Sequence, residues 1–109
     1  MTQPITTIKK RSTFVYVREN GEFIRAYSFN LQKLKDKKLN NSIQVGYTAT
    51  KRLGNAVTRN KAKRRMRELA RKVITKYGKI NFYYVLIAKT SLVTMPFKKL
   101  ELELKNIII

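Results

Sequence analysis

The sequence predicts an α/β (α+β) fold, a two-layer sandwich in which helices pack on a small mixed sheet. Two segments alternate apolar and polar side chains, as half-buried strands do, and a third is almost wholly apolar, as a buried central strand is. Two further segments repeat apolar residues at helical spacing. With 109 residues, 43% of them hydrophobic, the chain is expected to form a single domain over residues 1–109. The expected order is helix–strand–strand–helix–strand–helix, with room for one extra short strand.

The first half of the chain is expected to hold one short helix and two strands. The helix covers residues 12–20, because Ser12 can cap its start and Gly21 can follow its end. The first strand lies within residues 24–32 and the second within residues 43–50, with a polar loop between them. The alternating apolar residues are Tyr27, Phe29 and Leu31 in the first strand and Ile43, Val45 and Tyr47 in the second.

A long basic helix is expected over residues 58–77, with Gly78 suited to its end. Its apolar residues recur three and four positions apart and form one stripe, which predicts packing against the sheet. Several arginines lie away from this stripe, so the opposite face is cationic. The stripe consists of Ala62, Met66, Leu69, Ala70, Val73, Ile74 and Tyr77, and the arginines outside it are Arg64, Arg65, Arg67 and Arg71.

The last third of the chain is expected to hold a buried strand, residues 81–89, and a final helix. Thr94 and Pro96 mark the helix start. If the strands that flank the basic helix are parallel neighbours, the general preference of such crossovers predicts a right-handed connection. The apolar face of the final helix consists of Phe97, Leu100, Leu104 and Ile108.

The charge of the chain indicates a polyanionic partner. The formal net charge is +19 at pH 7, from 25 Lys and Arg against 6 Asp and Glu, so a small domain repels itself until an anion neutralises it. Ten of the cations fall within residues 51–72, and six of these are arginines, whose planar fork suits phosphate oxygens. Glu68 is the only acid there, whereas solvated helices usually mix Glu with Lys. Nucleic acid is therefore favoured over a merely solvated face.

The start of the basic helix contains an electrostatic conflict. Arg59 and Lys61 lie near the positive end of the helix dipole, where a cation is disfavoured by about 0.3–1 kcal/mol. A phosphate bound at the helix N-terminus would relieve this conflict. Just before the helix, Gly54 permits a tight turn and Asn55 can hydrogen-bond locally or to a ligand. These features together indicate a phosphate-binding helix start.

Composition excludes several classes of site. The chain has no Cys and no His, which excludes disulfides, thiolate sites, imidazole catalysis and the usual zinc sites. No apolar run approaches the roughly 18 residues of a membrane span. Residues 1–12 lack the hydrophobic centre of a signal peptide. We therefore expect a cytoplasmic protein without a membrane partner.

The segment from Lys51 to Arg64, KRLGNAVTRNKAKR, closely resembles the signature of the protein component of bacterial ribonuclease P. In that family the motif follows a strand and opens a basic helix, as it is expected to do here. The predicted first helix is also similar to the family's first helix, with Phe14, Val17 and Gly21 in matching places. The apolar strand and the final helix match as well, so the resemblance covers roughly residues 8–105.

This resemblance implies a small RNA-binding subunit that joins a catalytic RNA and removes the 5′ leader of precursor tRNA by Mg²⁺-dependent hydrolysis. It implies an endoribonuclease whose catalysis and Mg²⁺ reside mainly in the RNA, so that the protein alone is inactive. It also implies a left-handed strand–helix–strand crossover, which we adopt over the general preference. The implied RNA-subunit-binding residues are Lys51, Arg52, Asn55, Arg59, Asn60, Lys61, Lys63, Arg64 and Arg67. The implied leader-binding residues are Lys10, Phe14 and Arg18.

The chain departs from the family pattern at two of these positions. Lys61 stands where relatives commonly have Arg, which keeps the charge but loses the bidentate fork. Arg18 stands where relatives often have an aromatic residue, so any base stacking there would use the guanidinium plane.

Four other functions fit the sequence less well. A protein-only nuclease would need clustered carboxylates for its metal, and the six acids share no such motif. A ribosomal protein or assembly factor would explain the composition and the basic helix equally well, and only the motif distinguishes the two functions. A DNA-binding module needs a base-reading helix, and a membrane-active helix is disfavoured by an Ala-rich stripe suited to packing on a sheet. No DNA partner is expected, and the sequence does not indicate a protein-bound metal site.

Overall fold

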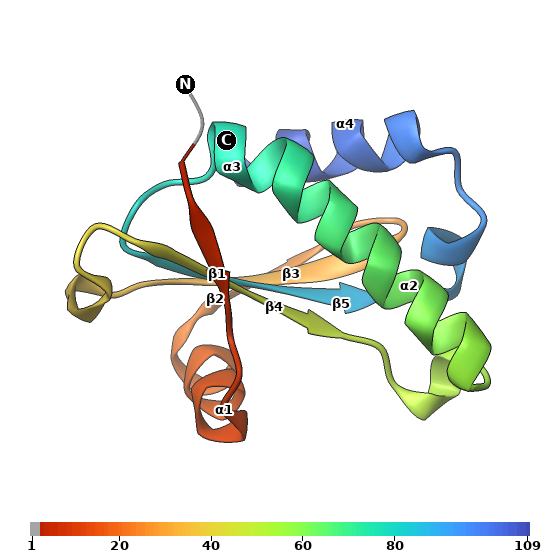
Figure 1. Cartoon of the computed structure of the whole chain (residues 1–109), viewed down its shortest axis with the longest axis horizontal. Helices are drawn as coiled ribbons and strands as arrows, with labels where there is room; N and C mark the ends of the chain where they lie inside the picture. Colours follow the sequence, from red (N-terminus) through yellow and green to blue (C-terminus); the bar gives the residue numbers. More distant parts are fainter. Residues whose placement is uncertain (1–2) are drawn as a thin grey trace.

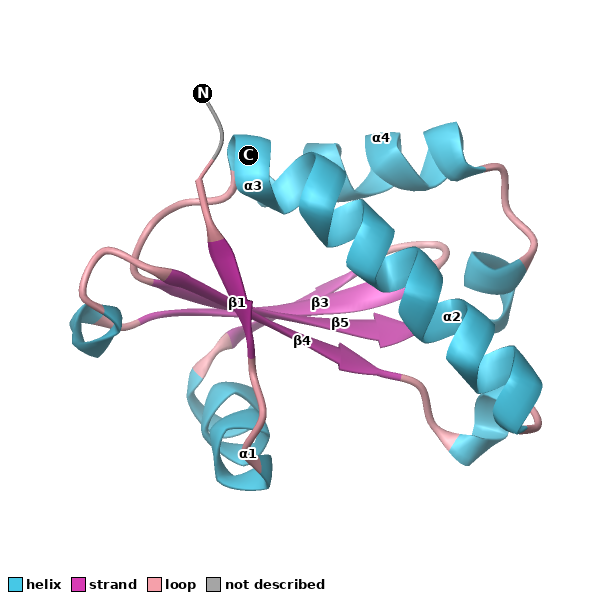
Figure 2. Cartoon of the chain, viewed as in Figure 1, coloured by secondary structure: helices cyan, strands magenta, loops and turns pink. Residues whose placement is uncertain are grey.

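The computed structural model describes residues 3–109 and shows a five-stranded mixed sheet with helices on both faces (Figure 1). Figure 2 shows the same view by secondary structure, with the sheet edge-on between the helices. The predicted mixed α/β fold is confirmed, and the first helix forms a partial third layer. The strands are β1 (Ile5–Thr7), β2 (Glu22–Arg25), β3 (Phe29–Lys35), β4 (Ile43–Thr48) and β5 (Phe82–Ala88). The helices are α1 (Arg11–Asn20), α2 (Ala56–Leu69), α3 (Thr75–Tyr77) and α4 (Phe97–Ile108).

The strand order is β1-β4-β5-β3-β2, with β1, β4 and β5 parallel and β3 and β2 antiparallel to their neighbours. Strand β5 is central, as its apolar sequence predicted, and β1 is the extra short strand. In Figure 1, β4 runs from left to right, α2 returns to the left above the sheet, and β5 runs to the right behind β4. This path is a left-handed crossover, so the family resemblance was the better guide than the general preference.

The strand expected within residues 24–32 is two strands joined by a tight turn. Ala26 N–H donates to Phe29 O at 3.0 Å, and Tyr27 is 72% exposed at the turn rather than inside a strand. The turn is held from the other end of the chain, because Glu103 accepts hydrogen bonds from the backbone N–H and the hydroxyl of Ser28 at 2.9 and 2.7 Å. Alternation of apolar residues cannot reveal a turn that a distant carboxylate stabilises.

Helix α1 is confirmed, but its expected cap is wrong. The helix begins one residue earlier, at Arg11, and Lys10 precedes it without a side-chain cap hydrogen bond, so Ser12 lies inside the first turn. The expected end at Gly21 is correct, since its N–H donates to Val17 O at 2.8 Å. A Cβ at Gly21 would lie 2.7 Å from Lys33 O, so glycine allows the end of α1 to approach β3.

The long basic helix is confirmed, and it begins two residues before the expected start. It runs from Ala56 through a π-helical segment, Ala70–Ile74, to Tyr77. Its stripe packs on the sheet together with the buried face of α4, and the main core lies between them. Gly78 ends the helix, and a Cβ there would meet Ile74 O at 2.6 Å. The buried stripe residues are Ala62, Met66, Leu69, Ala70, Val73 and Ile74, and those of α4 are Leu100, Leu104 and Ile108.

Candidate nucleic-acid interface

The turn before α2 is shaped by the motif residues themselves. A 3₁₀ turn, Lys51–Leu53, leads into Gly54, whose φ of 143° is readily accessible only to glycine. Asn55 caps the helix, and its Oδ1 accepts the N–H of Thr58 at 3.0 Å. Arg59 donates to Gly54 O at 3.0 Å, so part of its guanidinium holds the turn. This local bond offsets some of the dipole conflict that the sequence indicated at Arg59.

The exposed surface of α2 divides into two sides. Lys63 and Arg67, four residues apart, share the side that faces β4. The Arg67 guanidinium lies 5.9 Å from the ring centroid of Tyr47. Burial raises the pKa of Tyr47, and the nearby Arg67 charge partly opposes that rise. The phenol therefore stays neutral, and its ring makes a cation–π contact with Arg67.

Most other cations of α2 and its preceding turn are exposed. Arg65, which is not in the expected binding set, is the exception. Arg64 is exposed, as expected. Arg65 was expected on the cationic face as well, but it lies at the seam with α4, where it donates to Met95 O and stands 5.8 Å from the ring centroid of Phe97. Arg65 therefore joins α2 to α4. The exposed residues of the expected RNA-subunit-binding set also include Lys51, Arg52, Asn55, Asn60, Lys61 and Arg67.

A hollow of ≈ 520 Å³ lies between α1, the end of β4 and α2. Phe14 lies beside Gly46, where an added Cβ would come within 2.5 Å of the Phe14 ring. Phe14 and Arg18 of α1 line this hollow together with Lys63 of α2. The structure thus brings together residues that the sequence assigned to two separate roles. The full lining is Lys9, Arg11, Phe14, Val15, Arg18, Tyr47, Thr48, Ala49 and Lys63.

Lys10, the third expected leader-binding residue, does not line the same hollow. It lines a neighbouring one of ≈ 290 Å³ with Thr13 and Tyr83, and Lys9 is shared by both. Tyr47 is a site residue that the sequence assigned only to the strand's apolar face. Its place among the alternating apolar residues of β4 predicted that it packs in the core. No nearby residue in the sequence indicated that Arg67 would lie over its ring.

The far side of α1 is tied to the loop after β3. Tyr16 Oη donates to Asp36 Oδ2 at 2.9 Å, and its ring meets Tyr83 edge-on with centroids 6.1 Å apart. The Lys38 backbone N–H and the Tyr16 hydroxyl hold the pKa of Asp36 below its usual value. The hydrogen bond to Asp36 raises the pKa of Tyr16 in turn. These contacts hold α1 over the sheet and leave the hollow open on its other side.

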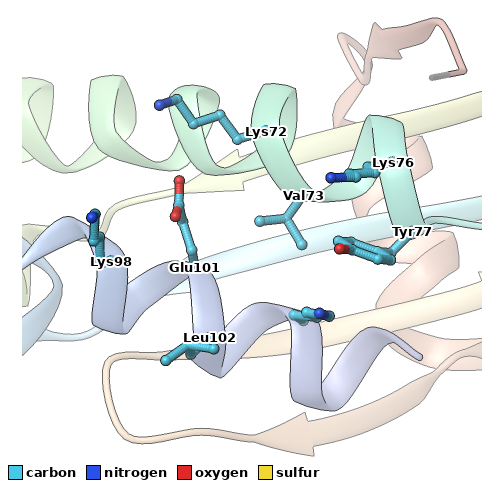
Figure 3. A pocket seen from close by; sticks show the side chains of 8 residues that line it. Lys72, Val73, Lys76, Tyr77, Lys98, Glu101 and Leu102 are labelled. Carbon is cyan, nitrogen blue, oxygen red and sulfur yellow. The ribbon is translucent and has the colours of Figure 1, made fainter. Parts of the chain in front are cut away.

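A second basic groove, of ≈ 470 Å³, separates the end of the long helix from α4 (Figure 3). In Figure 3, Lys72 and Lys76 project from the long helix and Lys98 from α4, with Glu101 between the two helices. Lys105 Nζ lies 4.8 Å from the ring centroid of Tyr77, so this lysine rests on an aromatic face. This groove lies on the α4 side of the long helix, away from Phe14 and Lys63.

Several acids of the chain have structural contacts in separate places. Asp36 accepts from Tyr16, Glu68 pairs with Arg71, and Glu103 holds the β2–β3 turn. Within residues 3–109, no three His, Cys, Asp or Glu side chains gather as metal ligands would. Over the same residues, no helix has the length and apolarity to cross a membrane. The hollow beside α1 and the groove beside α4 both offer cations, an aromatic ring and hydrogen-bonding groups, which is the chemistry that holds phosphates and bases.

The chain is similar to several known ribonuclease P proteins in sequence and in structure. Residues 4–109 match the protein family described as Ribonuclease P. A ribonuclease P protein component of Ruegeria pomeroyi is 42% identical over 91 residues, which cover 80% of this chain and 70% of that protein. One of Brucella suis is 33% identical over 110 residues, which cover 94% and 77%.

Among solved structures, the RNase P protein of Staphylococcus aureus matches with a TM-score of 0.76 at 26% identity, covering 92% of this chain and 89% of that one. The RNase P protein of Thermotoga maritima matches with a TM-score of 0.79 at 23% identity, covering 94% of each chain, and shares the fold.

Proposed function

Because the chain belongs to the ribonuclease P protein family, we propose that it is the protein subunit of a ribonucleoprotein that matures the 5′ ends of tRNA. In this proposal the exposed cations of α2 and its preceding turn bind a catalytic RNA subunit. The hollow beside α1 binds the single-stranded 5′ leader of precursor tRNA. The cytoplasm remains the expected place of action.

The observation that supports this proposal is the hollow that Phe14, Arg18 and Lys63 line together. One wall is the RNA-binding helix itself, so a strand in the hollow would lie directly beside the bound RNA subunit. The floor offers Phe14, a half-buried ring next to Gly46, and the rim offers cations. A cationic groove with an aromatic surface is the usual way of holding a single strand.

We assign the hydrolytic step to the RNA subunit and the Mg²⁺ bound to it. Phosphodiester hydrolysis of this kind uses metal ions that stabilise the attacking and leaving oxygens. Asp36, Glu68 and Glu103 are engaged in separate places, and within residues 3–109 no three acids gather, which does not fit a metal site. The protein's own contribution is then to neutralise phosphates and to position the leader.

The test is cleavage with and without the RNA subunit. RNA-free protein incubated with precursor tRNA and Mg²⁺ should release no leader, and addition of the RNA subunit should restore release. A protein preparation that removes the leader by itself, after treatment to destroy contaminating RNA, would overturn the assignment of catalysis.

A ribosomal protein or assembly factor would use the same cationic helix. Such a protein would bind its RNA without discriminating precursor from mature tRNA. Comparing the two tRNA affinities of the reconstituted complex therefore separates the two functions.

A further inference from the structure

The groove between the end of the long helix and α4 gathers positive charge that the proposed function does not use. Its lining includes four lysines, two from each helix, around a volume of ≈ 470 Å³. Glu101 is the acid among them and lies between the two helices (Figure 3). Within residues 3–109, Glu101 forms no ion pair with a neighbouring cation. The charge of the groove is therefore not neutralised by the chain itself. The four lysines are Lys72, Lys76, Lys98 and Lys105.

Two of these lysines, one from each helix, are held against the same aromatic ring. The Nζ atoms of Lys76 and Lys105 lie 5.6 and 4.8 Å from the centroid of the Tyr77 ring. Cation–π contacts at exposed sites stabilise by about 0.5–1 kcal/mol each, but here they bring two like charges together, and those charges repel. An anion bound beside both ammonium groups would relieve that repulsion. Because the contacts already restrict two flexible side chains, less conformational entropy is lost when the anion binds.

Phe97 joins this groove to the arginines of α2. The Lys72 ammonium lies 5.6 Å from the centroid of the Phe97 ring, and the Arg65 guanidinium lies 5.8 Å from the same centroid. Phe97 also lines a second hollow of ≈ 470 Å³, together with the exposed Arg64 and Arg71. The two hollows therefore meet at one ring. The cationic surface of α2 continues past the motif helix and into the groove beside α4.

The groove and the proposed leader hollow lie on different sides of the sheet. In Figure 1, α1 lies below the sheet, whereas α2 and α4 lie above it. Lys63 is the residue of α2 that lines the hollow, and Lys76 lines the groove. The interval from Lys63 to Lys76 corresponds to about 20 Å along a helix. A leader nucleotide beside Phe14 therefore leaves the groove open to a different anion, and the RNA subunit proposed to lie along α2 is the adjacent one.

We propose that the groove between the long helix and α4 is a second contact surface for the catalytic RNA subunit. Its lysines contact phosphates of one backbone segment, and the junction at Phe97 lets that segment continue toward Arg64 and Arg71. Lysine is a flexible point charge, so the groove adds affinity and orientation without reading sequence. This inference rests on the proposed function, because it requires the same RNA subunit as the partner.

The experiment titrates the protein with the transcribed RNA subunit over a salt series. Lys76→Gln/Lys105→Gln removes two groove charges, and the slope of log affinity against log salt should fall by about 1.4–1.8, twice the value for one phosphate contact. If the two contacts contribute nothing at 1 M salt, this slope corresponds to roughly 10- to 30-fold weaker assembly at 0.15 M. Lys76→Arg/Lys105→Arg should assemble normally, because it keeps both charges. The matched control Lys35→Gln/Lys37→Gln removes two exposed lysines at the end of β3 and just after it, and should leave the slope unchanged.

A second measurement identifies the RNA that occupies the groove. At concentrations that fully assemble the Lys76→Gln/Lys105→Gln holoenzyme, its affinities for precursor and mature tRNA should equal those of the unmodified holoenzyme. A variant that assembles normally and binds precursor tRNA more weakly would place substrate RNA in the groove and overturn the assignment to the RNA subunit. Equal weakening toward an unrelated RNA of the same length would also overturn it, because the groove would then contribute only general attraction to polyanions.

The outcomes separate this inference from the proposed function. If Arg64→Ala weakens assembly and Lys76→Gln/Lys105→Gln does not, the groove is not an RNA surface and the proposed function stands. An acidic protein segment would then suit the groove better, since Leu102 at its edge is 59% exposed. If neither variant weakens assembly, both proposals are wrong. Loss of repelling charges should not lower the melting temperature, so an assembly defect that comes with a lower melting temperature, or that the arginine variant shares, would make the lysines structural and overturn the inference.

Discussion

At the scale of single residues, the contact between Phe14 and Gly46 fixes where the Phe14 ring lies in the hollow beside α1. Gly46 has an ordinary backbone conformation, so its role is the space that a missing Cβ leaves. The Phe14 ring occupies that space, and Ile8 lies next to it. The proposed leader site would therefore depend on a strand glycine as much as on an aromatic residue.

Gly46→Ala should displace the Phe14 ring, because the added Cβ would lie 2.5 and 2.8 Å from two of its carbons. Overpacking of this kind typically costs about 1–3 kcal/mol of stability. We expect weaker binding of precursor tRNA with little change for mature tRNA, measured on the holoenzyme, and a lower melting temperature of the free protein.

A double variant provides the control. In Phe14→Ala/Gly46→Ala the Cβ meets no ring, so the stability losses should be clearly less than additive. Additive losses would mean that Gly46 acts through the backbone and not through Phe14.

At the scale of elements, α2 has two neighbouring arginines with different tasks. Arg64 is exposed, whereas Arg65 joins α2 to the segment before α4 through Met95 O and Phe97. Both are arginines on one helix, one residue apart. They form a matched pair that separates RNA binding from folding.

Arg64→Ala should weaken assembly with the RNA subunit and leave the melting temperature unchanged. If one phosphate contact is lost, the slope of log affinity against log salt should fall by about 0.7–0.9. Arg65→Ala should lower stability by about 1–3 kcal/mol, because the Met95 carbonyl loses its hydrogen-bond donor and the contact with the Phe97 ring is lost. Binding titrations over a salt series and denaturant melts measure the two effects. The reverse result, with Arg64 required for stability and Arg65 for the salt slope, would contradict the geometry.

At the scale of the whole molecule, a net charge of +19 opposes the compact state. Lysines at the end of the long helix and on α4 face each other across a shared groove, with Glu101 as the acid among them. RNA supplies the missing anions in the proposed complex. The free protein should therefore depend on dissolved anions for part of its stability.

We expect the melting temperature of the free protein to rise as salt is added, since screening shortens the Debye length from about 30 Å at 0.01 M to about 8 Å at 0.15 M. Sulfate should raise it more than chloride at equal ionic strength, because divalent anions also bind between neighbouring cations. In a double variant such as Lys76→Gln/Lys105→Gln, the melting temperature should rise less with salt than it does in the unmodified protein. A melting temperature that is independent of salt would show that the charges are too well separated to matter.

The sequence by itself determined the elements and the basic helix. The stripe from Ala62 to Ile74 and the apolar β5 are local patterns, and each depends on neighbours within a few residues. The motif that begins at Lys51 also lies within one stretch of chain, which is why the RNA-binding set could be proposed before the fold was known.

Only the tertiary structure decided which distant residues meet. The turn after β2 depends on Glu103, 75 residues away, and the alternating sequence there gave no sign of it. Phe14 and Lys63 share a hollow because α1 and α2 both lie beside the end of β4. Helix periodicity predicts that Arg65 faces solvent. In the structure Met95 and Phe97 pack against it, and their position is also set by long-range packing. Pairing and packing are long-range contacts, and residue spacing along the chain does not encode them locally.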